Sequence, residues 1–344
     1  MRFLLVSHRA APFPGGTEVF VQAIAEAAQK AGHQAVILTG AHQGDLNGVR
    51  ITDDRHVLRE RFDLIVVHGA NRGPPREVLA AAASLASPVL YMLVAHGVLL
   101  PRGRHLRACR FLGWSTALDR QAIALHGLEA RMVQVRHGIV TAEAHGLPGF
   151  RARHGIAADR QMFLSCGGYW PNKRMRPLAR LFERTPGDAL LVTTGYDNRH
   201  NAMPTPSHRV LPLLLNDRAE VLSAMREADG YLMHSRHEGF GLVLLEAMVN
   251  ETPWIAHATG GVAQLGAFGQ TYRSDAELRG LLADFSPDPA RIARARDHAI
   301  GAHDIRATLY DIEAAARHAA AEPSAPPART IAWLRALRGA WRGA

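Results

Sequence analysis

Short apolar runs alternate with longer amphipathic stretches in both halves of the chain. In the first half, residues 18–31 fit a helix that Gly32 ends. The runs that read as buried strands in this half cover residues 3–7, 34–39, 63–68, 88–96, 111–114 and 132–135. This pattern predicts a parallel, doubly wound α/β domain of six or seven strands. Such a domain binds its ligands at the carboxyl ends of the strands.

The second half restarts the same alternation after a polar stretch. A helix is expected to begin near residue 170 and to run through Phe182, and a late helix covers residues 304–318. The expected strands of this half cover residues 162–166, 189–195, 210–214, 230–234 and 253–256. A chain of 344 residues is long for one core and comfortable for two domains.

Composition narrows the classes of partner. The 40 Lys and Arg against 31 Asp and Glu give a net charge of +9, and only Lys30 and Lys173 are lysines. A basic protein suits nucleic acid, anionic lipid or a phosphorylated substrate. The sequence carries no helix-turn-helix, RNA-binding or zinc-finger signature, so nucleic acid is not expected. Two cysteines give neither a disulfide framework nor a metal-ligand spacing, which favours buried thiols in a reducing compartment.

The stretch 234–248, HSRHEGFGLVLLEAM, carries the most specific chemistry. It links a strand-like run to an apolar helix, so backbone amides of its loop can face an anionic ligand. Gly239 and Gly241 allow close approach of the backbone. Glu238 can reach the hydroxyls of a bound sugar, and Glu246 can accept from another hydroxyl pair, such as that of a ribose. The alternative for Glu246 is an ordinary helix with one partly exposed glutamate.

Lys173 lies where the helix that ends near Phe182 begins. A lysine at a helix N-terminus is unfavourable against the helix dipole unless an anion binds there. We therefore expect Lys173 to contact a phosphate, the alternative being a free surface lysine.

Three further features lie at expected strand ends of the first half. The Gly15-Gly16 pair follows the first strand, where it allows close approach to a phosphate or serves only as a turn. It does not match G-x-G-x-x-G, which disfavours a dinucleotide fold. His68 and His96 each end an apolar strand and precede a glycine, which favours a cleft, and we prefer His96 as the functional residue.

The motif at 234–248 resembles that of the retaining glycosyltransferases of family 4, which carry Glu-x7-Glu in an E-G-F-G context. Glu238 and Glu246 match the two carboxylates, and Lys173 matches the phosphate lysine of the family. Gly16 matches its loop glycine near the phosphates, and His96 its histidine that touches the donor sugar. The resemblance covers about residues 1–320.

This resemblance implies an α/β fold of the GT-B type, with two Rossmann-like doubly wound domains and the active site in the cleft between them. The implied organisation is an acceptor-side domain at 1–141, a linker at 142–158, a nucleotide-sugar-binding domain at 159–303, a helix at 304–320 that crosses back to the first domain, and a Pro-rich linker with a basic amphipathic tail at 321–344.

The implied reaction moves a sugar, of hexosyltransferase type, from a UDP- or GDP-sugar to a glycan or lipid-linked hydroxyl with retention of configuration. No metal or cofactor is expected, since the family needs none and no Asp-x-Asp occurs on a strand end. His96, Lys173 and Glu238 are the expected catalytic residues. The expected donor-binding residues are Gly15, Gly16, Lys173, Arg174, Glu238, Gly239, Phe240, Gly241 and Glu246.

Three positions depart from the family pattern. Gly168 takes the place of an arginine, Gln264 that of a glutamate, and His137 that of an asparagine. We expect Arg174 or another arginine to compensate for Gly168, or donor binding to be weaker. Two alternatives remain: a nucleotide-sugar epimerase of the same fold, and a catalytically silent nucleotide-sugar-binding homologue, which the first two departures favour.

Two basic segments bear on location. Residues 101–110 are a solvated surface segment or a contact for the acceptor or a membrane. Residues 330–342 place Trp333 and Trp341 on one helical face beside arginines, which fits a docked helix or an interfacial membrane helix. No apolar run reaches the roughly 18 residues of a spanning helix. We therefore expect a cytoplasmic protein, peripheral on the inner face of the plasma membrane.

Overall fold

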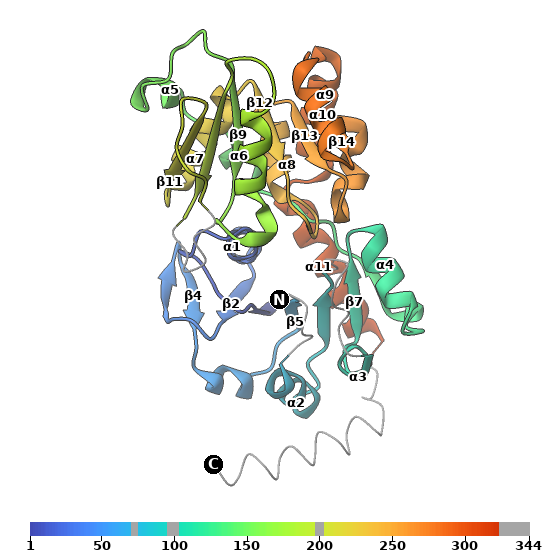
Figure 1. The fold of residues 1–344 in the computed structure, drawn as a ribbon. Coiled ribbons are helices and arrows are strands. Elements are labelled where there is room, and N and C mark those ends of the chain that lie inside the picture. Colours follow the sequence, from blue (N-terminus) through green and yellow to red (C-terminus); the bar gives the residue numbers. More distant parts are fainter. Residues whose placement is uncertain (70–74, 95–102, 197–202, 323–344) are drawn as a thin grey trace. The chain divides into compact units, whose positions relative to one another are not determined.

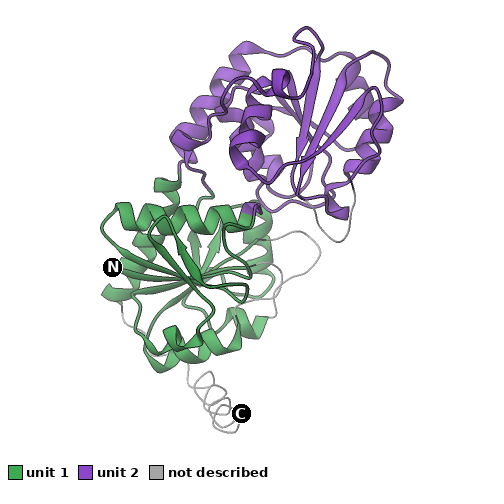
Figure 2. Cartoon of the chain, turned by 90° about the vertical axis from the view of Figure 1, so that its left-hand side faces the viewer, with its two compact units in different colours: residues 1–13, 17–137, 305–344 green, residues 14–16, 138–304 purple. Residues whose placement is uncertain are grey.

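The computed structural model describes residues 1–69, 75–94, 103–196 and 203–322 (Figure 1). The chain divides into two compact units, which Figure 2 colours separately. The first unit holds the described parts of residues 1–13, 17–137 and 305–344, and the second holds residues 14–16 and 138–304 within the same limits.

The described residues of the first unit form an eight-stranded sheet in the order β3-β4-β2-β1-β5-β6-β7-β8. All neighbours are parallel except β3 and β4. Its strands are β1 (Arg2–Val6), β2 (Gln34–Leu38), β3 (Gly44–Leu46), β4 (Val49–Thr52), β5 (Leu64–His68), β6 (Val89–Met92), β7 (Phe111–Trp114) and β8 (Met132–Gln134). The parallel sheet confirms the doubly wound prediction for this half.

The β3–β4 hairpin was not predicted, because its strands are short and largely polar. Its turn is Asn47-Gly48, with φ of 53° and 79°. Two consecutive residues of positive φ make the turn that suits a two-residue hairpin, and Asn-Gly is its strongest sequence signal. That dipeptide was therefore the available clue.

Helix α11 (Ile305–Ala321) belongs to the first unit, although the second unit precedes it in sequence. Arg136 donates from Nη2 and Nε to the two carboxylate oxygens of Asp311, at 2.7 and 2.9 Å. Thr308 donates to the carbonyl of Arg136 at 2.8 Å.

The other helices of this unit are α1 (Gly16–Lys30), α2 (Arg76–Ser84), α3 (Gly103–Leu106), α4 (Ala117–Ala124) and the 3-10 turns η1 (Arg55–Arg59) and η2 (Glu129–Arg131).

The described residues of the second unit form a six-stranded, fully parallel sheet in the order β11-β10-β9-β12-β13-β14. Its strands are β9 (Met162–Cys166), β10 (Leu190–Gly195), β11 (Val210–Leu214), β12 (Gly230–Met233), β13 (Trp254–His257) and β14 (Gln270–Tyr272). The edge strand β14 was not predicted, since its three residues carry no apolar run.

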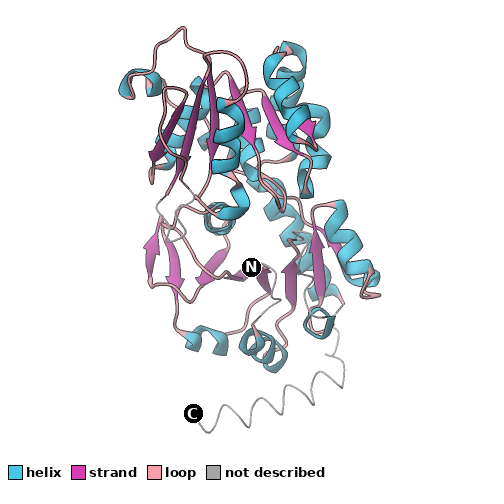
Figure 3. Cartoon of the chain, in the orientation of Figure 1, coloured by secondary structure: helices cyan, strands magenta, loops and turns pink. Residues whose placement is uncertain are grey.

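Helices cover both faces of this second sheet (Figure 3). One buried cluster packs α6 (Met175–Glu183) and α9 (Asp275–Ala283) on one face. The other face packs α7 (Arg218–Glu227), α8 (Leu242–Val249) and α10 (Pro289–Ala302). The remaining elements are α5 (Phe150–Arg153), η3 (Thr141–Glu143), η4 (Pro171–Lys173) and η5 (Gly260–Phe268).

Residues 142–158, for which we expected a linker, lie in the second unit. Ala144, Phe150 and Ile156 are buried in its core. These three apolar side chains anchor the segment to the second unit.

Candidate active site

The sequence-predicted residues of the second half meet at the carboxyl ends of β9, β12 and β13. The loops that follow these strands hold Lys173, Glu238 and Gly260 in turn. The carboxyl edge is where open parallel sheets bind ligands. These loops therefore form the candidate site.

The 234–241 loop changes direction at Gly241, the N-cap of α8. Its φ of 92° lies in the left-handed region that favours glycine. No side chain caps this helix, so its first amides are not satisfied by an N-cap side chain. Phe240 turns inward and packs in the core, 5.2 Å from the His303 ring. Phe240 therefore anchors the loop, and its side chain does not project toward a ligand.

The Thr259-Gly260-Gly261 turn fixes the backbone beside Glu238. Gly261 donates its amide to the carbonyl of Gly239 at 2.7 Å. A Cβ at Gly260 would lie 1.7 Å from the Glu238 carbonyl oxygen, and Gly260 has a φ of 56°. Thr259 donates its hydroxyl to the carbonyl of Arg236 at 3.1 Å. The two loops are thus locked together through backbone contacts that only glycine permits.

Lys173 and Glu238 form an ion pair with 2.6 Å between Nζ and Oε1. Their side chains are 23% and 12% exposed. Burial by itself lowers the pKa of the Lys173 ammonium, but the charge and hydrogen bond of Glu238 outweigh it and the pKa is raised. The amide of Arg236 donates to the Asn172 carbonyl at 2.7 Å, which holds the two loops in this register.

Glu246 is held by Arg218, a residue that the sequence analysis did not single out. Arg218 Nη1 lies 2.7 Å from Glu246 Oε1. The charge of Glu246 raises the pKa of the Arg218 guanidinium, and partial burial opposes this. Arg218 begins α7 directly after the N-cap Asp217. A cation in a first helical turn was the signal used for Lys173, and it would have identified Arg218 as well.

Arg174 faces a different group of residues from Lys173. It adopts a left-handed backbone conformation, with a φ of 54°, and is the N-cap of α6. Burial, and after it the charge of Arg174, lower the pKa of His234 to about 4. The same two causes lower the pKa of His257. The charges that raise the pKa of Lys173 come instead from Glu238, Cys166 and Tyr196.

Gly168, in the place of the family arginine, lies beneath two aromatic rings. A Cβ there would be 2.4 Å from Trp170 Nε1 and 2.5 Å from Tyr196 Cζ. Trp170 Nε1 donates to the Tyr196 hydroxyl at 2.7 Å. The aromatic pair therefore fills the space that a longer side chain at this position would need.

The predicted residues of the first half of the chain are described only in part. Gly15 precedes α1 and Gly16 is its first residue. His96 lies outside the described residues, as do Pro101 and Arg102 of the basic run and the tail from residue 323 onward. His68 ends β5 and lies 5.6 Å, between ring centroids, from Phe20.

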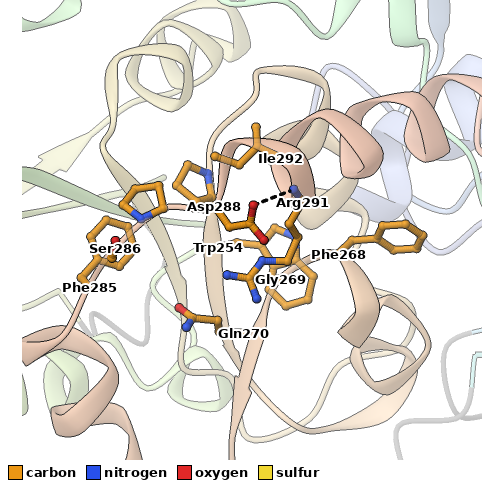
Figure 4. A pocket seen from close by; sticks show the side chains of 11 residues that line it. Trp254, Phe268, Gly269, Gln270, Phe285, Ser286, Asp288, Arg291 and Ile292 are labelled. Atoms are coloured by element: carbon orange, nitrogen blue, oxygen red, sulfur yellow. Dashed lines mark hydrogen bonds between the residues drawn. The ribbon is translucent and has the colours of Figure 1, made fainter.

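A shallow pocket lies at the opposite edge of the second sheet (Figure 4). It is lined by Trp254 and Gln270, which begin β13 and β14, and by Asp288 and Arg291 near the start of α10. Asp288 accepts from the Arg291 amide at 3.2 Å, as an N-cap does. This pocket lies at the amino ends of the strands and is separate from the Glu238 loop.

In the ranges that the structure describes, no group of three or more His, Cys, Asp or Glu side chains is arranged to hold a metal ion. None of the described helices is long and apolar enough to span a membrane.

Part of the chain is similar in sequence to known glycosyltransferases. Residues 205–339 match the sequence profile of the family described as "Family 4 Glycosyltransferase in conflict systems". A D-inositol 3-phosphate glycosyltransferase of Kineococcus radiotolerans is 32% identical over 177 residues, which is 45% of this chain and 41% of the relative. The chain thus spans about two fifths of the length of this curated relative.

Two solved structures share the fold at low identity. Sucrose-phosphate synthase from Thermosynechococcus elongatus superposes with a TM-score of 0.73 at 16% identity, over 93% of this chain and 99% of the other. The Anabaena protein HepE, in complex with UDP-glucose, gives 0.71 at 17% identity, over 92% and 99%. The solved structures show that the fold is GT-B, and residues 205–339 are similar in sequence to the family 4 glycosyltransferase profile.

Proposed function

We propose that this chain is a retaining, metal-independent glycosyltransferase that moves a sugar from a nucleoside diphosphate to a hydroxyl acceptor. One observation carries the proposal. Two carboxylates of one loop-helix segment, Glu238 and Glu246, are each held by a cation, at 2.6 and 2.7 Å. They follow the carboxyl end of β12 in a parallel sheet, where a ligand of this fold is expected.

Each residue would have a distinct role. Lys173 would stabilise the charge that develops on the departing diphosphate, with help from loop amides. Glu238, its ion-pair partner, would hold the donor sugar, and Glu246 would hold the ribose. His96 would contact the donor sugar as well. In a front-face mechanism the leaving diphosphate takes the proton of the acceptor hydroxyl, so no separate general base is needed.

UDP- and GDP-sugars are the donors we propose. HepE was solved with UDP-glucose, and its fold covers nearly the whole of this chain. For the acceptor we propose a glycan or a lipid-linked sugar, in cell-surface polysaccharide or glycolipid synthesis. The net charge of +9 favours an anionic acceptor or surface. We further propose a cytoplasmic enzyme that associates with the inner face of the plasma membrane through residues 101–110 and 330–342.

A thermal-shift panel of UDP-, GDP-, ADP- and CDP-sugars tests the donor. A ligand at 100 times its dissociation constant adds about 2.7 kcal/mol to the stability of the folded state. Incubation of the stabilising donor, with and without a hydroxyl acceptor, then separates the alternatives. Transfer with retention supports the proposal, an epimerised donor without acceptor indicates an epimerase, and binding without turnover indicates a silent homologue.

A further inference from the structure

Arg218 and Glu246 bring two helices of the second unit together at the proposed nucleotide site. Arg218 is the first residue of α7, and Glu246 lies in the middle of α8. The Arg218 side chain is 40% exposed, whereas that of Glu246 is 11% exposed. The guanidinium is therefore the more open member of the pair, and the carboxylate lies beneath it.

Each of the two charges would be electrostatically unfavourable at its position without the other. A cation in the first turn of a helix opposes the helix dipole. A carboxylate that is nearly covered in an apolar helix needs a charged or hydrogen-bonding partner. The helix α8 is otherwise apolar from Leu242 to Val249, so Glu246 has no intrahelical cation. Glu246 thus offsets the unfavourable interaction of Arg218 with the helix dipole, and Arg218 offsets the desolvation cost of Glu246.

Arg218 Nη1 contacts the Oε1 oxygen of the Glu246 carboxylate at 2.7 Å. An ionised carboxylate has about four acceptor sites on its two oxygens. A fixed, ionised carboxylate with spare acceptor capacity suits two neighbouring hydroxyl donors, such as the 2′- and 3′-hydroxyls of a ribose. A freely rotating carboxylate would accept fewer bonds from them.

We propose that Arg218 is a positioning residue that orients the Glu246 carboxylate, so that the site recognises the ribose diol of a nucleoside diphosphate. The inference rests on the proposed function, because it assumes that a nucleotide binds beside Glu246. Its consequence is selectivity for ribonucleotides. A site built to bond a hydroxyl rejects the analogue that lacks it, since its buried polar group is then left unpaired.

The test compares UDP and GDP with their 2′-deoxy forms by isothermal titration calorimetry on the full chain. We expect the wild-type protein to prefer the ribonucleotide by about tenfold or more, from the loss of a hydrogen bond to a charged group. Arg218→Met should weaken ribonucleotide binding by a similar factor and change deoxynucleotide binding little. Arg218→Lys should restore part of the preference, and Arg180→Met, on the exposed end of α6, is the matched control.

A second pair of variants guards against a folding defect. In a Glu246→Gln background, Arg218→Met should cause no further loss of selectivity and should leave no unpaired buried charge. If Arg218→Met, or the double variant where the single one does not fold, keeps the wild-type selectivity, the proposal is overturned. A wild-type protein that binds neither UDP nor GDP overturns this inference together with the donor assignment. One that binds ribonucleotides selectively but transfers no sugar contradicts only the proposed activity.

Discussion

Lys173 and Glu238 form an ion pair in this protein, with 2.6 Å between Nζ and Oε1. From the sequence, we expected Lys173 to contact a phosphate and Glu238 to contact the sugar. Because the two side chains are in contact, we expect both to lie where the sugar joins the diphosphate. A charge that develops on the leaving oxygen would lie beside a lysine already desolvated and oriented.

Breaking this pair should affect stability and catalysis in different ways. Lys173→Met leaves the Glu238 carboxylate, 12% exposed, without its cation, which should lower the free energy of unfolding by about 1–3 kcal/mol. The double variant Lys173→Met/Glu238→Gln should recover most of that stability, because no buried charge is left. Urea denaturation of the three proteins measures both effects.

The catalytic effect should not be recovered. Lys173→Met should reduce kcat/KM by at least about 10²-fold in the single and the double variant, since the positive charge acts mainly in the transition state. Lys173→Arg should keep part of the activity. Wild-type turnover in Lys173→Met would place the phosphate contact elsewhere, with Arg174 as the next candidate.

Substitutions of Glu238 and Glu246 should affect different kinetic parameters. Glu238→Ala should chiefly lower turnover, because its carboxylate would contact the reacting sugar. Glu246→Ala should chiefly weaken nucleotide binding, by about 1.5–3 kcal/mol for a hydrogen bond to a charged group. Steady-state kinetics and nucleotide titration of both variants test this, and equal, near-wild-type behaviour of the two would refute the assignment.

The strands and the glycine-rich loop could be predicted because they depend on local pattern. Long apolar runs gave the central strands, and the E-G-F-G context placed Glu238 and Gly241 at the end of β12. The β14 strand and the role of Phe240 depend on tertiary packing, which local propensity does not encode. The contact of Arg218 with Glu246 could not be predicted, because the two residues lie 28 positions apart and only the fold brings them together.

The same limit applies to Gly168. Its sequence context suggested a lost arginine, whereas the structure places the hydrogen-bonded Trp170 and Tyr196 rings over it. Tyr196 directly follows the neighbouring strand β10, so no pattern around residue 168 could indicate the contact. The packing of the two rings restricts the side chain at residue 168, whereas the sequence shows only that this position is a glycine.

His234 should make the stability of the second unit depend on pH. Its pKa is about 4 in the folded protein, because of burial and then of the charge of Arg174, against 6.5 for an ordinary histidine. Between these values the unfolded chain binds a proton that the folded chain does not, so folding is fully favoured above about pH 6.5 and loses stability as the pH falls toward 4. His234→Asn should make the melting temperature less dependent on pH between about 4 and 6.5. His208→Asn, on the surface of the same unit, should leave this pH dependence unchanged. Parallel curves for the wild type and His234→Asn would contradict the prediction.

The tail should matter for membrane association and little for the fold. Each basic residue near an anionic surface contributes on the order of 1 kcal/mol, less at high salt, and interfacial tryptophans add an apolar contribution. Truncation after Ala321 should therefore leave the melting temperature nearly unchanged and weaken sedimentation with anionic liposomes. A drop of many degrees would instead mean that the segment docks on the protein body.

Gly260 and Gly266 offer a matched pair of substitutions within the same 3-10 segment, η5. At Gly260 an alanine Cβ would lie 1.7 Å from the Glu238 carbonyl oxygen, and φ is 56°. At Gly266 the nearest atom, Thr271 Cγ2, would be 3.9 Å away. Gly260→Ala should therefore cost about 1–3 kcal/mol of stability, as overpacking does, and Gly266→Ala much less.

The catalytic consequence distinguishes this site from an ordinary tight turn. To accept a Cβ at Gly260, the backbone of Glu238 must move, and its carboxylate must then lose register with Lys173. A displacement of this kind lowers turnover, because the reacting groups need close alignment. We expect Gly260→Ala to lower kcat by about 10²-fold while the protein stays folded, as measured by circular dichroism and donor turnover. Equal activity of Gly260→Ala and Gly266→Ala would show that the position of Glu238 does not limit the reaction, and Glu238 would then have to be removed from the catalytic residues.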